Sequence, residues 1–336
     1  MTQISTSRAD QAAVGELAAA LRGPLVQPAD PDYETARQLY NAMIDKRPAL
    51  IARCADAADV VTAVTFGREH GLDIAVRGGG HNGAGLGSCE GGLVVDLTPM
   101  KGVRIDPEAR VAHVAGGCTL GDLDHAAHQF GLGIPAGIIS TTGVAGLTLG
   151  GGFGHLTRKY GLSVDSLLAV DVVLADGSFV IASADRNEDL FWAVRGGGGN
   201  FGVVTSFTFR LHPVSTVIAG PTLWPMDQAA DVLRFYREFL PNAPEDLNGF
   251  FAFLTVPPVP MFPEALHRQK MCGIVWCYTG PPDQADELLA PVRALPALAL
   301  DGVGPVPYPA LQSVFDPLYP PGAAVVLAGG LREGAE

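Results

Sequence analysis

The sequence predicts an α+β protein made of two main parts, and three patterns support this prediction. Residues 49–77 follow the order strand, helix, strand, which is typical of a βαβ unit with parallel strands. Two apparent hairpins, at 102–117 and 167–183, predict antiparallel strands farther along the chain. Beyond Pro213, strands and helices occur in an order that favours antiparallel pairing, so we expect a domain boundary near residue 214.

The first part of the chain begins with helical patterns. Residues 1–45 are expected to form a helical lead-in, in which Asp32 caps a helix over 33–43. The βαβ unit then consists of an apolar strand, a helix with apolar residues at helical spacing and a second strand, at 49–54, 56–70 and 73–77.

Further elements are expected between the βαβ unit and residue 214. Asp106-Pro107 provides a turn for the first hairpin, and Thr119 can cap a helix that ends at His128. Asp176-Gly177 suits a type I′ turn in the second hairpin. The remaining elements are a strand, a short helix and a strand, at 93–97, 186–194 and 203–211.

The second part is expected to contain three strands and two helices. Prolines at 257, 258 and 260 interrupt it with a loop. The strands are predicted at 222–224, 249–256 and 270–280, and the helices at 227–240 and 283–294.

Composition excludes several classes of function. The 336 residues carry a net charge of −13, so a broad phosphate-binding surface, and with it a nucleic-acid partner, is not expected. The five cysteines form no CxxC pair, which argues against a disulfide framework and a structural zinc site. The chain shows neither a signal-peptide pattern nor an apolar run long enough to span a bilayer. We therefore expect a cytoplasmic protein with no membrane partner.

Two short motifs in the sequence lack the context that would give them a function. Glycines at 78–83 and 197–202 both match GxGxxG, but a dinucleotide site needs a helix to start in the loop, and strands follow both matches. His125 and His128 lie three residues apart on an expected helix, without a third ligand at suitable spacing. We expect no metal site.

Glycines form three clusters, at 78–92, 143–154 and 196–202. Consecutive glycine amides can point inward together as an anion site, and a bare backbone lets a ligand approach closely. Ser140, Thr141 and Thr142 add hydroxyl donors before the second cluster. The clusters therefore suit a large, flat, phosphorylated ligand, although each one taken alone can equally be explained by crowded turns.

Three stretches carry a resemblance to a known family. They are RGGGH at 77–81, PAGIISTTGVAGLTLGGGFGHLTRKYGLSVD at 135–165 and GGGGNFGVVTSFTFRLHPV at 196–214. In this order they resemble the flavin-linked oxidases of the berberine bridge enzyme type, within the vanillyl-alcohol oxidase superfamily. The resemblance covers about residues 45–322.

The resemblance implies a fold and a cofactor. The fold is a two-subdomain PCMH-type FAD-binding domain at 46–214, followed by an incomplete α+β substrate domain with an antiparallel sheet at 215–322. The residues that it places at the FAD are Arg77, Gly78, Gly79, Gly80, His81, Asn82, Gly83, Leu86, Gly87, Ser140, Thr141, Thr142, Gly143, Gly146, Gly150, Gly151, Gly152, Gly154, Asp165 and Val204. Gly151 is expected to have no room for a side chain.

The resemblance also implies how the FAD is attached. His81 corresponds to the histidine that bonds covalently to the flavin 8α carbon. Doubly attached relatives carry a cysteine after Pro-Ala-Gly, where this sequence has Ile139. We therefore expect a single covalent link through His81.

The activity implied is oxidation of a small molecule, with hydride transfer from a C–H next to OH or N to flavin N5, and O₂ as the electron acceptor. The family's catalytic motif, which resembles Asn-Tyr-x-Asn, is absent from this sequence. Tyr160 and Arg158 are weak catalytic candidates, and packing explains them at least as well. The alternative is a catalytically inactive FAD-binding remnant, and neither the substrate nor the oligomeric state can be predicted.

The end of the sequence departs from the resemblance. Family-like sequence extends through LQSVFDPLYPPG at 311–322, and residues 323–336 contain no aromatic residue. We expect these last residues to be an out-of-frame tail, so that the chain is truncated. The expectation can be tested against the nucleotide sequence.

Overall fold

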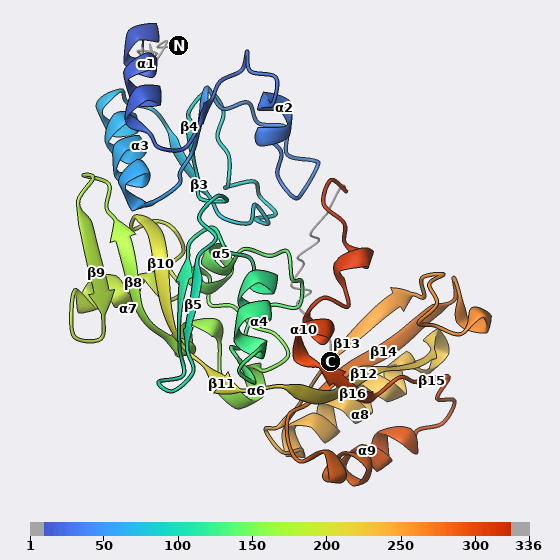
Figure 1. The fold of residues 1–336 in the computed structure, drawn as a ribbon. Helices are drawn as coiled ribbons and strands as arrows, with labels where there is room; N and C mark the ends of the chain where they lie inside the picture. The colour runs from blue at the N-terminus through green and yellow to red at the C-terminus, as the bar shows by residue number, and fades with distance from the viewer. Residues whose placement is uncertain (1–9, 324–336) are drawn as a thin grey trace.

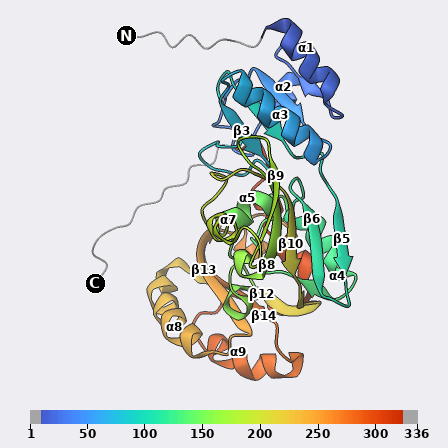
Figure 2. The same cartoon turned by 90° about the vertical axis from the view of Figure 1, so that its left-hand side faces the viewer.

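The computed structural model describes residues 10–323. Figure 1 shows three units that follow one another along the chain, from blue through green to orange, and Figure 2 shows the same units from the side. The expected out-of-frame tail at 323–336 lies outside the described residues except for Ala323.

The first unit contains a four-stranded sheet in the order β1-β2-β4-β3. Strands β2 and β3 both run parallel to β4, as the βαβ pattern predicts. Asp56 starts α3 by accepting hydrogen bonds from the amides of Ala58 and Asp59, which satisfies two free donors at the helix start. The elements are α1 Gln11–Ala20, β1 Leu25–Val26, α2 Tyr33–Ala36, β2 Leu50–Arg53, α3 Ala57–Glu69, β3 Ile74–Arg77 and β4 Leu93–Asp96.

The predicted helix over 33–43 is wrong, because α2 ends at Ala36. Asp32 makes no side-chain cap there. The Arg77 guanidinium donates to the carbonyls of Ala36 (2.6 Å) and Gln38 (3.4 Å), so a contact from a distant strand holds these carbonyls. A long-range hydrogen bond therefore overrides the local helical pattern.

The second unit is built on an antiparallel sheet in the order β5-β6-β10-β8-β9. Both predicted hairpins are present, and Thr119 starts α4 in a capping box with Asp122. The strands are β5 Val103–Asp106, β6 Val111–Ala115, β7 Leu132–Gly133, β8 Leu167–Val173, β9 Phe179–Ser183, β10 Val203–Arg210 and β11 His212–Pro213. The helices are α4 Leu120–His128, α5 Val144–Leu149, α6 Thr157–Tyr160 and α7 Glu188–Val194.

The turn between β8 and β9 differs from the predicted type. Gly177 has a φ of 86°, but Asp176 does not have a positive φ, so the turn is not type I′. The Gly177 amide donates to the Leu174 carbonyl, and the Leu174 amide donates to the Ser178 carbonyl. These bonds describe a longer loop in which only one glycine needs the left-handed conformation.

The third unit is an antiparallel sheet in the order β13-β14-β12-β15, with β16 also paired to β12. Two amphipathic helices, α8 and α9, pack on this sheet. The predicted strand at 222–224 is part of a longer strand, and the other predicted elements are present with shifted ends. The elements are β12 Thr216–Pro225, α8 Ala229–Asn242, β13 Leu247–Thr255, β14 Lys270–Tyr278, α9 Ala285–Arg293, β15 Leu300–Asp301, β16 Gly304–Pro307 and α10 Tyr308–Gln312.

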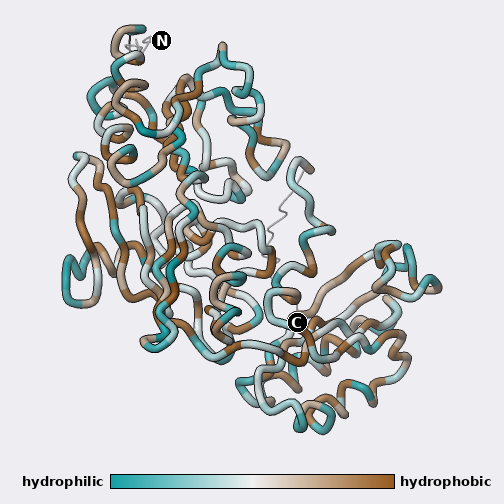
Figure 3. The backbone as a smooth tube through the Cα atoms, viewed as in Figure 1, coloured by the Kyte–Doolittle hydropathy of each residue, from teal (hydrophilic) through white to brown (hydrophobic). Residues whose placement is uncertain are grey.

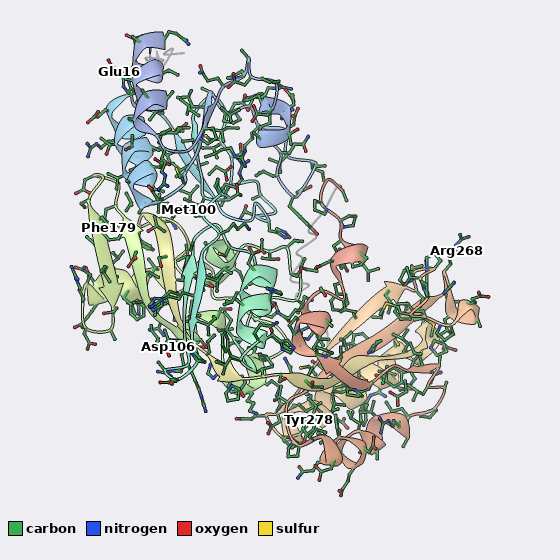
Figure 4. All side chains as sticks on the ribbon, in the orientation of Figure 1. Glu16, Met100, Asp106, Phe179, Arg268 and Tyr278 are labelled. Atoms are coloured by element: carbon green, nitrogen blue, oxygen red, sulfur yellow. The ribbon has the colours of Figure 1, made fainter. Side chains whose placement is uncertain are left out.

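Shared cores join neighbouring units. Met100, labelled in Figure 4, lies where the first two units meet, in one cluster with Leu97, Val173 and Val203. In Figure 3 the hydrophobic colour follows the strands inside the molecule and the hydrophilic colour gathers at outer turns. Within residues 10–323, no helix is long and apolar enough to cross a membrane.

Candidate functional site

The first two glycine clusters touch at Gly79 and Gly143. A Cβ atom added to Gly79 would lie 2.3 Å from the Gly143 amide nitrogen, and a Cβ added to Gly143 would lie 2.3 Å from the Gly79 amide nitrogen. Real Cβ atoms do not approach backbone so closely, so both positions require glycine. The loop after β3 therefore lies directly against the start of α5.

The third glycine cluster reaches the other end of the same helix. The amides of Gly196 and Gly198 donate to the Leu149 carbonyl at 3.1 and 2.9 Å. Leu149 is the last residue of α5, a helix that we did not predict because its sequence is interrupted by glycine. All three clusters thus meet around α5.

Part of this glycine-rich surface is open. A Cβ at Gly146 would have no atom within 4 Å, and a Cβ at Gly150 would have none closer than 3.6 Å. Gly151 has a φ of 107°, and its Cβ would meet only Leu162, at 3.8 Å. The chain itself leaves room for a side chain at Gly151, so the expected crowding there depends on a bound cofactor, and the positive φ favours glycine independently.

Other glycines of the predicted site are packed against the chain itself. A Cβ at Gly154 would lie 1.8 Å from the Ala136 carbonyl oxygen, and one at Gly152 would lie 2.4 Å from the Ser163 hydroxyl. At Gly152 and Gly154, crowding by the chain itself is therefore enough to explain why glycine is present. The open backbone is therefore limited to a subset of the cluster.

The loop after β3 presents free backbone donors. The amides of residues 79–83 donate to no acceptor within residues 10–323. A run of unpaired N–H groups next to open glycine surface can bind an anion without any positive side chain. A cavity of about 280 Å³ lies beside this loop, and its lining includes Tyr40, Arg53 and the glycines at 78–80.

His81 follows these glycines and has three side-chain neighbours. Its Nε2 lies 3.0 Å from the Thr141 hydroxyl and its Nδ1 lies 3.4 Å from the Thr142 hydroxyl. The Tyr40 ring stacks on the imidazole, with ring centroids 3.8 Å apart. These contacts bring together residues 40, 81 and 141–142, which are far apart in the sequence.

Burial lowers the pKa of His81 below its ordinary value, because a charged imidazolium loses hydration there. Hydrogen bonding to Thr141 and the charge of Asp316 oppose this effect. The imidazole is therefore neutral at neutral pH, and a neutral ring keeps one nitrogen lone pair available for bond formation.

Known proteins show the same combination of fold and sequence. A family model described as an FAD binding domain matches residues 48–183. An FAD-linked oxidoreductase of Dictyostelium discoideum is 32% identical over 310 residues, which are 92% of this chain and 66% of that relative. The solved structure of 6-hydroxy-D-nicotine oxidase from Arthrobacter nicotinovorans matches with a TM-score of 0.81 and 31% identity, covering 90% of this chain and 66% of the other. That of BBE-like 1 from Physcomitrella patens matches with a TM-score of 0.75 and 30% identity, covering 88% and 62%.

The chain belongs to the berberine bridge enzyme-like FAD-linked oxidoreductases. It spans between 45% and 66% of the length of the curated relatives that it matches. The family resemblance seen in the three glycine-rich motifs is confirmed.

The site fits FAD, the cofactor for which the matching family model is described. FAD is large, flat and phosphorylated, and the open backbone at Gly146, the unpaired amides at 79–83 and the Thr141 and Thr142 hydroxyls offer the matching surfaces. His81 offers a neutral imidazole at the same loop.

Several side chains that were predicted to contact the cofactor bond to other parts of the chain instead. Arg77 is buried in an ion pair with Asp96 at 2.8 Å. The Asn82 side-chain oxygen Oδ1 accepts from the backbone amides of Ala84 and Leu86, which shapes the loop. The Asp165 carboxylate accepts from the Leu162 amide at 2.8 Å. These side chains support the loops that carry the site.

The other predicted positions differ in exposure. Val204 is buried in β10, whereas Leu86 is 68% exposed. Gly80 and Gly87 lie beside the side chains of Leu39 and Arg77. Leu86 is therefore available to a ligand, and Val204 contributes to the core.

The two weak catalytic candidates have structural partners. The Arg158 guanidinium donates to the carbonyls of Ala243, Pro244 and Leu247 at 2.6–3.3 Å. Tyr160 stacks on His212 and donates to the Pro213 carbonyl at 3.4 Å. Arg158 therefore joins its segment to the third unit, whereas Tyr160 packs against β11 of the second unit. Both contacts agree with the packing explanation given for these residues above.

Sequence reasoning missed two residues near His81. Tyr40 lies in the segment that we predicted to be helical, and Asp316 lies near the end of the family-like sequence. Neither residue belongs to a recognisable motif, so only the fold reveals that both approach the histidine.

Metal ligands are not gathered in the part of the chain that the structure describes. Between residues 10 and 323, no group of three or more His, Cys, Asp or Glu side chains could hold a metal ion. His125 and His128 lie on α4, where His125 is exposed.

Proposed function

We propose that this protein binds FAD and uses it to oxidise a small molecule at a C–H next to OH or N. Membership of the FAD-linked oxidoreductases supports the cofactor and the reaction class. The observation that carries the proposal is the His81 loop, in which unpaired amides and a neutral imidazole face one glycine-rich surface. The bound flavin would supply the hydride acceptor at its N5 atom.

The chain's own residues have separate tasks in this proposal. The amides of residues 79–83 bind the phosphates, and the open backbone at Gly146 allows close approach. Tyr40, Thr141 and Thr142 orient the His81 imidazole. A fixed imidazole would hold the cofactor in one position, which favours productive geometry at the reacting atoms.

His81 is proposed to be the single covalent attachment. By the family resemblance, Ile139 occupies the position where doubly attached relatives have cysteine. Cys118 lies near α5 through its backbone carbonyl, but its thiol is buried and directed to the carbonyls of Met100 and Gly102. Burial raises the pKa of this thiol to about 11, so it stays protonated and unreactive.

The electron acceptor is proposed to be O₂, in keeping with the oxidases among the relatives. The name 6-hydroxy-D-nicotine oxidase describes a small-molecule oxidase, which supports a small molecule as the substrate here. The cytoplasm is the proposed location.

The first test is an absorbance spectrum of the purified chain before and after acid precipitation, together with its intact mass. We expect a flavin spectrum, colour that stays with the acid precipitate, and a mass increase of one FAD. A colourless protein that takes up no added FAD would overturn the cofactor assignment.

The second test separates an active enzyme from an inactive FAD-binding remnant. Anaerobic addition of alcohols, sugars and cyclic amines should bleach the flavin absorbance with one of these classes, and air should restore it. Flavin that dithionite reduces but no compound in the panel bleaches would favour the remnant over the enzyme.

A further inference from the structure

The last described segment, residues 313–323, runs from α10 to the loop after α2. Figure 1 shows this red segment leaving the third unit and approaching the blue part of the chain. Residues 316–323 of this segment, here called the strap, touch the surroundings of His81 at two places. Each place involves a residue that contacts the imidazole or is adjacent to such a residue.

The first contact is made by Asp316. Its carboxylate accepts from the Ser140 amide at 2.9 Å and also from the Ser140 hydroxyl. Ser140 directly precedes Thr141 and Thr142, whose hydroxyls contact both nitrogens of the His81 ring. The strap therefore fixes the start of the loop that carries both hydroxyl partners.

The second contact is made with Tyr40. The Tyr40 hydroxyl donates to the Tyr319 carbonyl, and the Gly322 amide donates to the Tyr40 carbonyl at 3.0 Å. The Ala42 amide also donates to the Ala323 carbonyl at 3.1 Å. The strap therefore holds the aromatic ring that stacks on the face of His81.

We propose that the strap positions the His81 imidazole from two sides, with Asp316 acting on the hydroxyl loop and the 319–323 backbone acting on Tyr40. The two sets of ring contacts come from segments about 100 residues apart, and the strap bonds to both. Asp316 is a positioning residue in this arrangement, because its carboxylate bonds to Ser140 and not to the imidazole. The consequence for flavin attachment rests on the proposed function, but the positioning itself does not.

The charge of Asp316 gives the proposal a spectroscopic readout. Burial lowers the pKa of His81, and the Thr141 hydrogen bond and then the charge of Asp316 oppose this by raising it. The other ionisable side chain against the ring is Tyr40, whose own pKa is raised by burial and by Asp316, so it stays neutral at neutral pH. Removing the Asp316 charge should therefore lower the His81 pKa further.

The experiment follows the His81 ring by NMR in full chain expressed under riboflavin depletion, so that no flavin is attached to His81. The His81 ring signal is assigned by its absence in His81→Ala, and its titration is compared in wild type, Asp316→Asn and Asp316→Ala. We expect a lower His81 pKa in both variants, and a larger change of the ring chemical shift in Asp316→Ala because the hydrogen bonds to Ser140 are also lost. Asp283→Asn, an exposed carboxylate on the third unit, is the matched control and should leave the signal unchanged.

A second variant tests the contact between the strap and Tyr40. Tyr40→Phe keeps the stacked ring but removes the hydroxyl that binds the strap, so it should shift the His81 ring signal and increase amide exchange at 319–323. Unchanged His81 signals in Asp316→Ala and Tyr40→Phe, with wild-type circular dichroism, would overturn the proposal.

The rate of flavin uptake then tests whether the strap also assists covalent attachment of flavin to His81. Apo-protein carrying Asp316→Ala should form the acid-stable flavin more slowly than wild type. If the His81 signals shift as expected but wild type takes up no FAD, the positioning role of the strap is supported and the proposed cofactor is wrong.

Discussion

The Tyr40 ring stacks on the His81 imidazole, with centroids 3.8 Å apart and planes inclined by 23°. The stack covers one face of the imidazole, and the Thr141 and Thr142 hydroxyls meet its two nitrogens. The ring is therefore held in one orientation before any ligand arrives. Such preorganisation lowers the entropic cost of placing a reactive group.

Replacing His81 with alanine should leave bound FAD extractable by acid. The change removes the nitrogen that we propose for the covalent bond, whereas the loop amides stay in place. Flavin absorbance is measured in the supernatant and in the pellet after acid precipitation. His125→Ala, on the exposed side of α4, is the matched control and should behave as wild type. Flavin that stays in the His81→Ala pellet would refute the attachment site.

Gly146→Leu should reduce FAD binding without unfolding the protein. A Cβ atom added there has no atom within 4 Å outside its own helix backbone and neighbouring residues, so a side chain would project into the space proposed for the cofactor. Gly15→Leu is the control, because Gly15 is also helical and open but lies on α1. Both changes should keep or raise stability by up to about 1 kcal/mol, since leucine favours helix over glycine. Equal FAD affinity in the two variants would contradict the proposed binding surface.

Gly151→Val should destabilise the fold through backbone strain. A φ of 107° is outside the regions that a β-branched residue adopts, and the expected cost is about 1–3 kcal/mol. Urea unfolding of flavin-free protein measures this cost directly. Gly102→Val serves as the control, because Gly102 has open space and no positive φ. A Gly151→Val midpoint equal to that of wild type would show that the segment readily changes conformation.

Asp124 should make the protein less stable as the pH rises. Its side chain is buried, and desolvation raises its pKa to about 7, while the neighbouring Gln312 opposes the shift. The folded state thus binds a proton more tightly than the unfolded state, in which the pKa is close to 3.8. This contribution to stability is complete below about pH 4 and is lost as the pH rises through about 7, with a slope of up to about 1.4 kcal/mol per pH unit.

Asp124→Asn tests this dependence, since an amide stays neutral at every pH. Stability curves of the two proteins between pH 4 and pH 8 should diverge, with the variant gaining relative to wild type as the pH increases. Asp122→Asn is unsuitable as a control because Asp122 belongs to the capping box of α4, whereas Asp185→Asn changes an exposed turn. Parallel curves for wild type and Asp124→Asn would rule out the titration.

Local signals predicted much of the fold. Asp56 and Thr119 both cap the helices that the sequence predicts, because a cap uses amides within three residues of the capping side chain. Asp32 has the same sequence character but makes no side-chain cap, and α2 ends at Ala36, whose carbonyl accepts from Arg77. The prediction fails where a contact between residues 41 positions apart determines the structure.

The candidate site was predictable in part for the same reason. Its glycines and His81 form motifs that can be read locally, and the structure brings the three clusters together around α5. Tyr40 and Asp316 reach His81 from segments without motifs, so their roles depend on the complete fold. Sequence also could not separate Gly146, which is open, from Gly154, which is packed against Ala136.

The bonds made by the segment after α5 limit how the molecule can move. Arg158 binds three carbonyls of the third unit, Lys159 pairs with Asp246 at 2.5 Å, and the Asn248 amide donates to the carbonyls of Gly154 and His155. A hinge opening between the glycine-rich surface and the sheet of the third unit would have to break all of these bonds together. Access for a reactant is therefore expected through motions of side chains and loops at a rigid joint, and the choice of reactant through the shape of a preset opening rather than through closure of two lobes.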